Sequence, residues 1–329
     1  MTNGVLVDEV SFDVRISSGG LLGGLLGGLV SGGGAPTDWI VRGSLYRPSH
    51  APRCTSSVLL LLHGVSQSRH VWDLRAGGLH YSAAHRLASA GYPVVAVDRL
   101  GYGTSGRPSG RDLTIQAHAS VTAQIVTALR SGSYGGGPGL GFTHVGLVGH
   151  SLGTEIAELC VGSPNSGGEV DVLIATGYTH FTSLRLLGAM AGMLGPALLT
   201  NYVYFGGSPE NRTELFYDSA GTDAAIVAEE TRRANLTPSG EILSVIGRPS
   251  GAVIGAITLP VLLLLAERDV LFPSGEGLAE LGLFTSAPDR ELRTVPESGH
   301  VLFLHRRWTY AVDEILAWLG RHPGELPAC

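Results

Sequence analysis

The sequence predicts an α/β protein whose mostly parallel, twisted sheet carries helices on both faces, with a helical insertion between two of its strands. Three observations lead to this fold class. From Val58 onward, short, continuously apolar runs alternate with stretches of helical periodicity, as expected for strands buried on both faces of a parallel sheet. Residues 180–258 break this alternation, and residues 1–50 show alternating rather than continuous apolar positions.

The N-terminal region, residues 1–50, predicts a hairpin at the edge of the sheet. Apolar residues alternate over residues 5–16 and again over residues 39–46, which is typical of strands. The Gly/Leu-rich segment 18–34 connects them. We interpret it either as an elongated connection whose leucines lie on the surface or in a pocket, or as a disordered loop, because ordering glycine costs backbone entropy.

The central strands and helices follow in alternation, which predicts right-handed βαβ crossovers. A run of ten residues rich in glycine, 132–141, is expected to be a loop. Strands are predicted at residues 58–62, 93–97, 145–148, 170–174, 260–265 and 291–295, and helices at residues 80–90, 113–129, 152–160 and 304–319.

Residues 180–258 are expected to form a helical cap or lid over the carboxyl edge of the sheet, because a helical, aromatic-rich insertion between strands commonly covers that edge. The core is then divided into residues 1–179 and 259–329. Helical patches fall at residues 184–199, 224–234 and 241–246, and the aromatic residues are Tyr202, Tyr204, Phe205, Phe216 and Tyr217.

The charged residues exclude several chemistries. The 329 residues include 22 Lys+Arg and 28 Asp+Glu, for a formal charge of −6, and every cationic residue is an arginine. Without lysine there is no Schiff-base nucleophile, pyridoxal-phosphate anchor or P-loop lysine. The mild acidity also argues against a nucleic-acid partner, since phosphate binding needs a cationic surface.

No metal site or cofactor is predicted. Cys54, Cys160 and Cys329 share no metal-type spacing, and we expect small thiols in the core or at the surface, with Cys329 in a frayed terminus. His80 and His85 are five residues apart, a spacing that does not place two rings on one face of a helix. The pair His300 and His305 has the same spacing.

The N-terminal sequence predicts a cytoplasmic protein without a membrane span. Acidic residues at positions 8, 9 and 13 precede any apolar run, which is unlike a signal peptide. The apolar stretch 21–30 is broken by glycine pairs and is shorter than the roughly 20 residues that cross a bilayer. These features do not determine the oligomeric state.

The pentapeptide Gly-His-Ser-Leu-Gly at 149–153 carries the strongest chemical signal. It matches G-x-S-x-G, which is weak evidence alone in a chain with 48 glycines, but it follows a predicted strand and opens a predicted helix. This context defines a nucleophile elbow, in which flanking glycines let a strained Ser151 stand clear of the backbone. His150 is interpreted as a packing residue, with a second base as the alternative.

A base and an acid for Ser151 follow in the expected order. A serine hydroxyl needs a general base and an orienting carboxylate. Asp269 comes just after the strand at 260–265, and His300 comes after the strand at 291–295, so the order is Ser, Asp, His. Glu267 is the competing acid.

Two backbone amides are predicted to form the oxyanion hole. One is the amide of Leu152 at the helix start, and the other is that of Val65, after the strand at 58–62. The remaining cap aromatics are expected to pack in the core. The residues expected to shape or line an apolar pocket are His63, Gly64, Trp72, Tyr178, Tyr202, Phe205, Phe216, Val270, Leu271 and Val301.

Together these landmarks resemble the α/β-hydrolase superfamily, in its serine-nucleophile form with a helical cap. The matching features are His63-Gly64, the turn at 98–105, the elbow around Ser151, and Asp269 with His300, and they span residues 58–319. The resemblance implies hydrolysis of a carboxylic ester or related acyl group, a metal-free site and a lid that sets substrate choice. It places the chain with esterases, lipases, lactonases, C–C bond hydrolases and cofactor-free peroxidases rather than with carboxylate-nucleophile enzymes.

One departure concerns Thr154-Glu155, where many relatives carry Gly-Gly or Gly-Ala. Glu155 is interpreted as an N-terminal-turn residue favoured by the helix dipole, and the alternative is a polar group that tunes the site.

The leading hypothesis is a serine hydrolase acting on a small to medium, mainly apolar ester or lactone, with no further partner predicted. A C–C bond hydrolase, or an acyl transferase or cyclase in small-molecule biosynthesis, could use the same three residues. A ligand-binding protein with little turnover is the third hypothesis.

Overall fold

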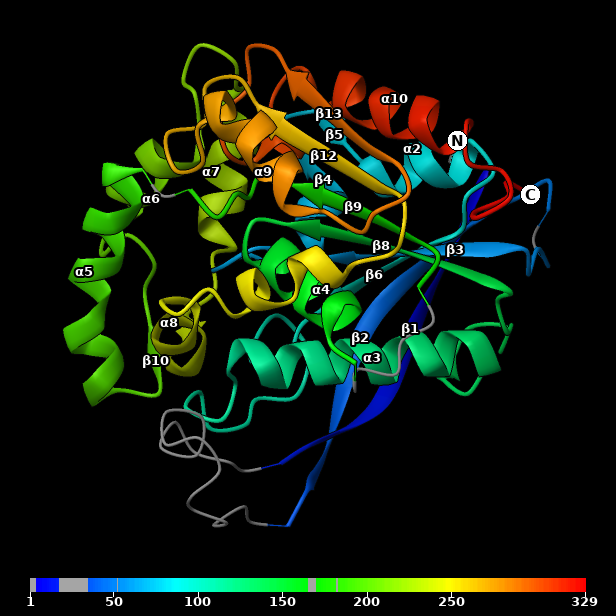
Figure 1. Cartoon of the computed structure of the whole chain (residues 1–329), viewed down its shortest axis with the longest axis horizontal. Coiled ribbons are helices and arrows are strands. Elements are labelled where there is room, and N and C mark those ends of the chain that lie inside the picture. Colours follow the sequence, from blue (N-terminus) through cyan, green and yellow to red (C-terminus); the bar gives the residue numbers. More distant parts are fainter. Residues whose placement is uncertain (1–3, 18–34, 52, 165–169, 182) are drawn as a thin grey trace.

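A nine-stranded sheet forms the centre of the molecule (Figure 1). The computed structural model describes residues 4–17, 35–51, 53–164, 170–181 and 183–329. Among these residues the strand order is β13-β12-β9-β8-β3-β6-β2-β1-β7, and helices cover both faces. The predicted fold class is therefore confirmed.

The six strands from β13 to β6 in the sheet order are parallel. They coincide with the six strands predicted from the apolar runs to within two residues at each end. Their side chains are buried on both faces except in β13, which lies at the edge of the sheet. This is why their sequences lack alternation. The strands are β3 (Ser57–Leu62), β6 (Val94–Asp98), β8 (His144–His150), β9 (Val172–Thr176), β12 (Val261–Ala266) and β13 (Arg290–Val295).

The N-terminal hairpin is also confirmed. Strand β1 (Val5–Ile16) pairs antiparallel with β2 (Thr37–Pro48) along its full length, and β2 pairs antiparallel with β6. A short strand, β7 (Gly135–Gly136), adds to the outer edge. The Gly/Leu-rich segment 18–34 lies outside the described residues.

Helices α3 (Ile115–Ser131) and α4 (Leu152–Gly162) cover one face of the sheet, while α2 (Ala83–Ser89) and α10 (Trp308–Leu319) cover the other (Figure 1). Helix α9 (Gly277–Leu283), not predicted, packs near β13. One boundary differs in kind: the helix predicted at 80–90 begins only at Ala83. Residues Leu79–Tyr81 instead form β5, which pairs with β4 (Leu74–Ala76) in a small hairpin.

The segment 180–258 is mainly helical and lies beyond the carboxyl ends of β8 and β9 (Figure 1). None of the described helices is both long and apolar enough to cross a membrane. The segment contains α5 (Leu184–Leu199), α6 (Pro209–Phe216), α7 (Ala224–Arg232), α8 (Ser239–Val245) and the short antiparallel pair β10 (Tyr202–Val203) and β11 (Thr237–Pro238).

The expectation was wrong for Cys54 and Cys329. Cys54 and Cys329 form a disulfide between Cα atoms 5.9 Å apart, although 275 positions separate them in the sequence. The C-terminus is not frayed, because the Cys329 amide donates to the Gly91 carbonyl over 2.8 Å and Leu326 is fully buried. Spacing rules detect cysteines that lie close in sequence, so they could not reveal this pair. Cys160 is a buried thiol.

We expect Cys54→Ser to lower the free energy of unfolding by about 2–5 kcal/mol, because the disulfide closes a very long loop and restricts the unfolded chain. Urea unfolding with and without reductant measures this. Cys329→Ser should have the same effect as Cys54→Ser, and the double variant should lose nothing further. Unchanged stability of the unaltered protein in reductant would contradict the prediction.

Candidate active site

Ser151 occupies a strained turn between β8 and α4. Its φ is 53° and its ψ is −124°, a conformation that non-glycine residues rarely adopt. A Cβ at Gly149 would lie 2.4 Å from the Thr154 Cα, and one at Gly153 would lie 2.3 Å from the Leu62 carbonyl oxygen. Only glycine fits at either position, which explains why the serine is flanked by these two residues.

Ser151, His300 and Asp269 form a continuous hydrogen-bonded chain. His300 Nε2 lies 2.8 Å from Ser151 Oγ, and His300 Nδ1 lies 2.8 Å from Asp269 Oδ2. The other carboxylate oxygen accepts from the amides of Leu271, at 2.8 Å, and Phe272, at 3.1 Å. Asp269 is thus fixed by the backbone and orients the imidazole, and this geometry allows a proton to pass from serine to histidine.

Glu267, the competing acid, lies elsewhere. Its side chain is about half exposed, accepts the Glu297 amide at 2.8 Å and lies 3.9 Å from the Arg268 guanidinium. It is on the surface beside the strand end, whereas Asp269, two residues later, faces His300.

The loop 63–68, which follows β3, lies directly beside the serine. Val65, Ser151 and Leu152 line the same cavity. A Cβ at Gly64 would lie 3.0 Å from Ser151 Cβ and 3.3 Å from the His150 carbonyl oxygen, so the 63–68 loop packs closely on the elbow. The two residues predicted to supply oxyanion donors therefore both adjoin Ser151.

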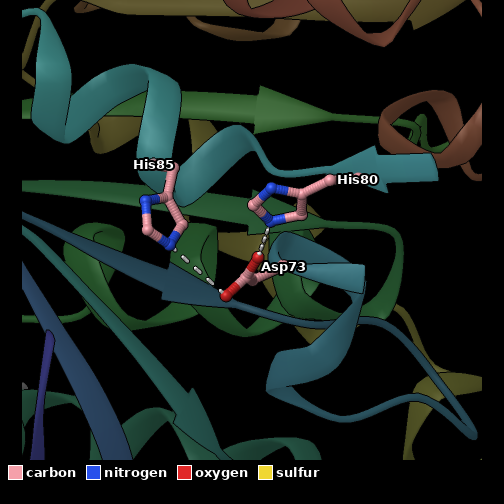
Figure 2. A group of neighbouring side chains, drawn as sticks. All are labelled: Asp73, His80 and His85. Atoms are coloured by element: carbon pink, nitrogen blue, oxygen red, sulfur yellow. Dashed lines mark hydrogen bonds and ion pairs between the residues drawn. The ribbon is translucent and has the colours of Figure 1, made fainter. Parts of the chain in front are cut away.

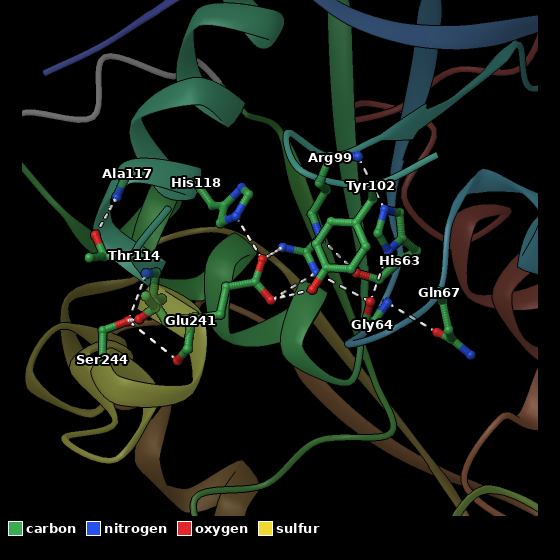
Figure 3. A network of polar contacts seen from close by, with 12 residues as sticks. His63, Gly64, Gln67, Arg99, Tyr102, Thr114, Ala117, His118, Glu241 and Ser244 are labelled. Atoms are coloured by element: carbon green, nitrogen blue, oxygen red, sulfur yellow. Dashed lines mark hydrogen bonds and ion pairs between the residues drawn. The ribbon is translucent and has the colours of Figure 1, made fainter. Parts of the chain in front are cut away.

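The core side of the 63–68 loop is held by Arg99 (Figure 3). Its guanidinium donates to the carbonyl oxygens of His63, at 3.1 Å, and Gly64, at 3.2 Å. It also pairs with Glu241 of α8 over 2.5 Å. Figure 3 shows two further groups on the same carboxylate: the Tyr102 hydroxyl at 2.6 Å and His118 Nε2 at 2.7 Å.

Glu241 is ionised despite complete burial. Burial alone would raise the pKa of its carboxyl, but Arg99 and then His118 outweigh this and lower the pKa from 4.5 to about 2. Burial lowers the pKa of His118 itself. A charged helix residue is thereby joined to the loop beside Ser151.

A second buried arginine holds the other side of the 63–68 loop. Arg212 of α6 donates to the Ser66 hydroxyl over 2.9 Å and pairs with both oxygens of Glu230 in α7, at 2.7 and 2.6 Å. Arg212 outweighs the effect of burial and lowers the pKa of Glu230. Asn235 donates its amide to the Ser66 carbonyl over 2.8 Å. The loop therefore contacts the helical segment through several polar groups.

An apolar cavity of about 140 Å³ opens onto Ser151. Of the predicted pocket residues, Tyr178, Phe205 and Leu271 line it together with the elbow and Val65. Most of the other walls come from α5, α8 and the loop after β12, which the sequence did not single out: Leu186, Leu187, Met190, Ile242, Val245, Ile246, Arg248 and Phe272.

Two predicted pocket residues lie away from this cavity. Tyr202 places its ring under the Arg107 guanidinium and donates its hydroxyl to the Pro108 carbonyl over 2.7 Å. Val270, in the loop after β12, is 41 % exposed and does not line the cavity.

The remaining predicted pocket residues form the layer behind the site rather than its wall. Trp72 packs on Phe303, with ring centroids 4.8 Å apart, and Phe216 packs on Phe205 and on the His300 ring. His63, Gly64 and Val301 are buried but are not among the residues that line the cavity.

His150, inside the elbow, is a buried packing residue. Its ring centroid lies 5.1 Å from that of His300, and its Nδ1 contacts the Thr176 hydroxyl at 3.2 Å. Burial, followed by the nearby His300, holds its pKa well below 6.5. It is therefore neutral, which fits the packing interpretation.

Glu155 is more than an N-terminal-turn residue. It is fully buried behind the cavity wall, where the Tyr178 hydroxyl donates to one oxygen and the Ser250 amide donates to the other over 3.0 Å. The alternative interpretation, a polar group that supports the site through Tyr178, fits these contacts better than helix-dipole stabilisation alone.

Glu155 belongs to a group of three buried carboxylates. Glu158 lies one turn further along α4, and Glu280 of α9 contacts His180 Nδ1 at 2.8 Å. Burial, then Glu280 and then Glu155, raise the pKa of Glu158 well above 4.5. Glu158 therefore keeps its proton in the folded protein at pH values where an exposed glutamate has lost it.

Comparison with known sequences gives the family. Residues 59–312, more than half of the chain, match the sequence model of the alpha/beta hydrolase family. The chain belongs to this family, as its motif order and strand order indicate. Among curated proteins, none is similar enough to be matched.

Solved structures of similar fold include esterases and a lipase. An esterase from Thermogutta terrifontis has a TM-score of 0.65 at 17% identity, over 94% of this chain and 98% of that one. An esterase from Exiguobacterium antarcticum has a TM-score of 0.64 at 16% identity, over 86% and 96%. A monoacylglycerol lipase from Paleococcus ferrophilus has a TM-score of 0.59 at 20% identity, over 80% and 94%. At these identities the likeness establishes the fold.

Glu241→Gln should destabilise the protein at neutral pH by about 3–5 kcal/mol, because it leaves the Arg99 charge buried without a counter-charge. The depressed pKa of Glu241 stabilises the folded state above pH 4.5, and this contribution is lost as the pH falls from 4.5 toward about 2. The difference in free energy of unfolding between variant and parent, measured with urea, should therefore become smaller as the pH falls.

Glu229→Gln is the matched control for Glu241→Gln. Arg232 and Arg233 lower the pKa of Glu229, also to about 2, but the ion pairs are on the surface of α7. Solvent screens such pairs, so this variant should change stability little. Equal losses of stability in the two variants would show that burial does not increase the contribution of Glu241 to stability.

Glu158→Gln should give a second, opposite pH dependence. With its raised pKa, Glu158 contributes stability fully below pH 4.5 and loses that contribution as the pH rises through the folded-state pKa. Glutamine does not ionise, so the variant should gain stability relative to the parent between about pH 5 and about pH 8. Urea unfolding at both pH values tests this. Glu214→Gln, at an exposed position, is the control: its difference from the parent in free energy of unfolding should be the same at both pH values.

Proposed function

We propose that the protein is a serine hydrolase that cleaves a small to medium, mainly apolar carboxylic ester or lactone through an acyl-enzyme. The observation that carries this proposal is the hydrogen-bonded chain of Ser151, His300 and Asp269 at a strained elbow facing an apolar cavity. Membership of the alpha/beta hydrolase family supports it.

In the proposed mechanism, Ser151 Oγ attacks the acyl carbonyl while His300 Nε2 accepts its proton. Asp269 holds the imidazole in the required tautomer and stabilises the imidazolium. The amides of Val65 and Leu152 bind the oxyanion, aided by the N-terminus of α4. His300 then protonates the leaving alcohol, and water releases the acyl group by the same steps in reverse order.

The size of the cavity favours a compact substrate. Its volume of about 140 Å³ is close to that of engineered apolar cavities that hold one benzene molecule. We therefore expect a short acyl chain or a single ring on the side of the ester that enters it. We further propose that residues 180–258 act as the cap, because α5 and α8 supply much of the cavity wall.

Ser151→Ala should abolish ester hydrolysis and labelling by a fluorophosphonate. Asp269→Asn should lower kcat by about 10⁴-fold, because the imidazole would then adopt the wrong tautomer. Glu267→Gln is the matched control: it neutralises the acid two positions away, which does not contact His300, and should leave kcat within about twofold. Rates on p-nitrophenyl esters should be highest for short acyl chains.

Two outcomes would contradict this proposal. One is failure of the folded protein to react with the fluorophosphonate at Ser151. The other is a loss of activity in Glu267→Gln as large as in Asp269→Asn. Product analysis with an added alcohol separates hydrolysis from acyl transfer, because a transferase would form the new ester in preference to the free acid.

A further inference from the structure

Three side chains with metal-binding atoms, Asp73, His80 and His85, meet where β5 and the start of α2 lie close together (Figure 2). His80 Nε2 lies 2.5 Å from Asp73 Oδ1, and His85 Nε2 lies 3.7 Å from Asp73 Oδ2. The three ligand atoms all lie within 4.8 Å of one another. The side chains are half-buried, which leaves the group accessible to an ion from solvent.

These two histidines do not share a helix, so their spacing of five residues does not keep the rings apart. His80 belongs to β5, and His85 lies in the first turn of α2. Asp73 follows a short 3-10 helix, Arg69–Trp72. Three separate elements therefore converge, and Figure 2 shows both imidazole rings directed at the carboxylate.

The surroundings fix these groups from behind. The Tyr46 hydroxyl donates to Asp73 Oδ2 over 3.1 Å, and its ring lies edge-on to the His85 ring, with centroids 5.2 Å apart. Such outer contacts orient metal ligands in known sites.

We propose that Asp73, His80 and His85 bind one Zn²⁺ ion, with water as the fourth ligand. Two imidazoles and one carboxylate suit zinc better than magnesium or calcium, which prefer oxygen ligands. With metal–ligand distances of about 2.0–2.1 Å, ligands of a tetrahedral ion are roughly 3.3 Å apart. The two imidazoles contact different oxygens of Asp73, and one ligand atom from each of the three residues lies within 4.8 Å of the others. Side-chain rotations would have to bring one carboxylate oxygen and both imidazoles to that tetrahedral spacing.

A second group, Glu155, Glu158 and His180, also has neighbouring ligand atoms. There the Ser250 hydroxyl lies among them, 2.7 Å from Glu155, 3.0 Å from Glu158 and 2.9 Å from His180. The hydroxyl fills the position that an ion would take. The inference therefore concerns the Asp73 group alone.

The bound zinc would have a structural role. It would tie the β4–β5 hairpin to α2, and this hairpin supports α7: the Tyr81 hydroxyl donates to Asp223, and a Cβ at Gly77 would lie 2.6 Å from that of Ala225. Because zinc would bind the folded chain and not the unfolded one, it should raise the Tm. The proposed esterase activity should not require zinc.

The test uses the full-length protein without a polyhistidine tag, freed of metal by a chelator. Isothermal titration with Zn²⁺ should show one site per chain, and Co²⁺ should give the visible absorption of a tetrahedral site. His80→Ala, His85→Gln and Asp73→Asn should each weaken Zn²⁺ binding by at least tenfold and remove the rise in Tm that zinc causes.

His144→Ala is the matched control. The side chains of His144 and Asp171 are 28% and 23% exposed, as are those of His80 and Asp73. The Asp171 carboxylate differs in that it pairs with Arg130 and with one histidine instead of two. This variant and Glu158→Gln should bind Zn²⁺ as the parent does. Absence of stoichiometric binding, binding unaffected by the three ligand substitutions, or equal loss in His144→Ala would overturn the proposal.

Discussion

The 63–68 loop is held between two buried arginines, and the arrangement around Ser151 depends on them. Arg99 donates to two carbonyl oxygens of the loop from the core, and Arg212 donates to the Ser66 hydroxyl from α6. Each guanidinium is neutralised by a buried glutamate, Glu241 or Glu230. Removing one member of a buried pair leaves an uncompensated charge, so both pairs constrain the loop far more strongly than surface ion pairs would.

These pairs also limit how residues 180–258 can move. Glu241, Arg212 and Glu230 all belong to this segment, so lifting it as a rigid unit would separate Arg99 from Glu241 and Arg212 from Ser66. Helix α5 contains none of these groups. It contributes Leu186, Leu187 and Met190 to the cavity wall and exposes Leu184 and Leu199 by more than 80 %. A displacement of α5 alone would therefore leave both pairs in place.

Structural features that depend on a local sequence pattern could be predicted. Continuous apolar runs located the parallel strands, and Gly149 and Gly153 marked the elbow because only glycine fits beside Thr154 and Leu62. The positions of Asp269 and His300 after later strands followed from the strand order.

Features that depend on contacts between distant segments could not be predicted in the same way. The Cys54–Cys329 disulfide and the Arg99–Glu241 pair join residues far apart in the chain, and nothing near either residue identifies its partner. The pocket was only partly predicted, because its walls come from the apolar face of α5, and periodicity alone does not show which face meets the cavity. Asp73 was missed because a strand at His80 was read as helix.

The absence of lysine acquires a structural meaning in this site. In the sequence it excluded lysine-based chemistry, whereas in the structure the two arginines that contact the 63–68 loop hold its backbone and hydroxyl groups. Arg99 contacts two carbonyl oxygens and a carboxylate at once, through separate nitrogens of one rigid plane. An ammonium group donates from a single atom and is more strongly hydrated, so lysine would reach fewer of these acceptors and would be harder to bury. Arginine is therefore the cation that this loop requires.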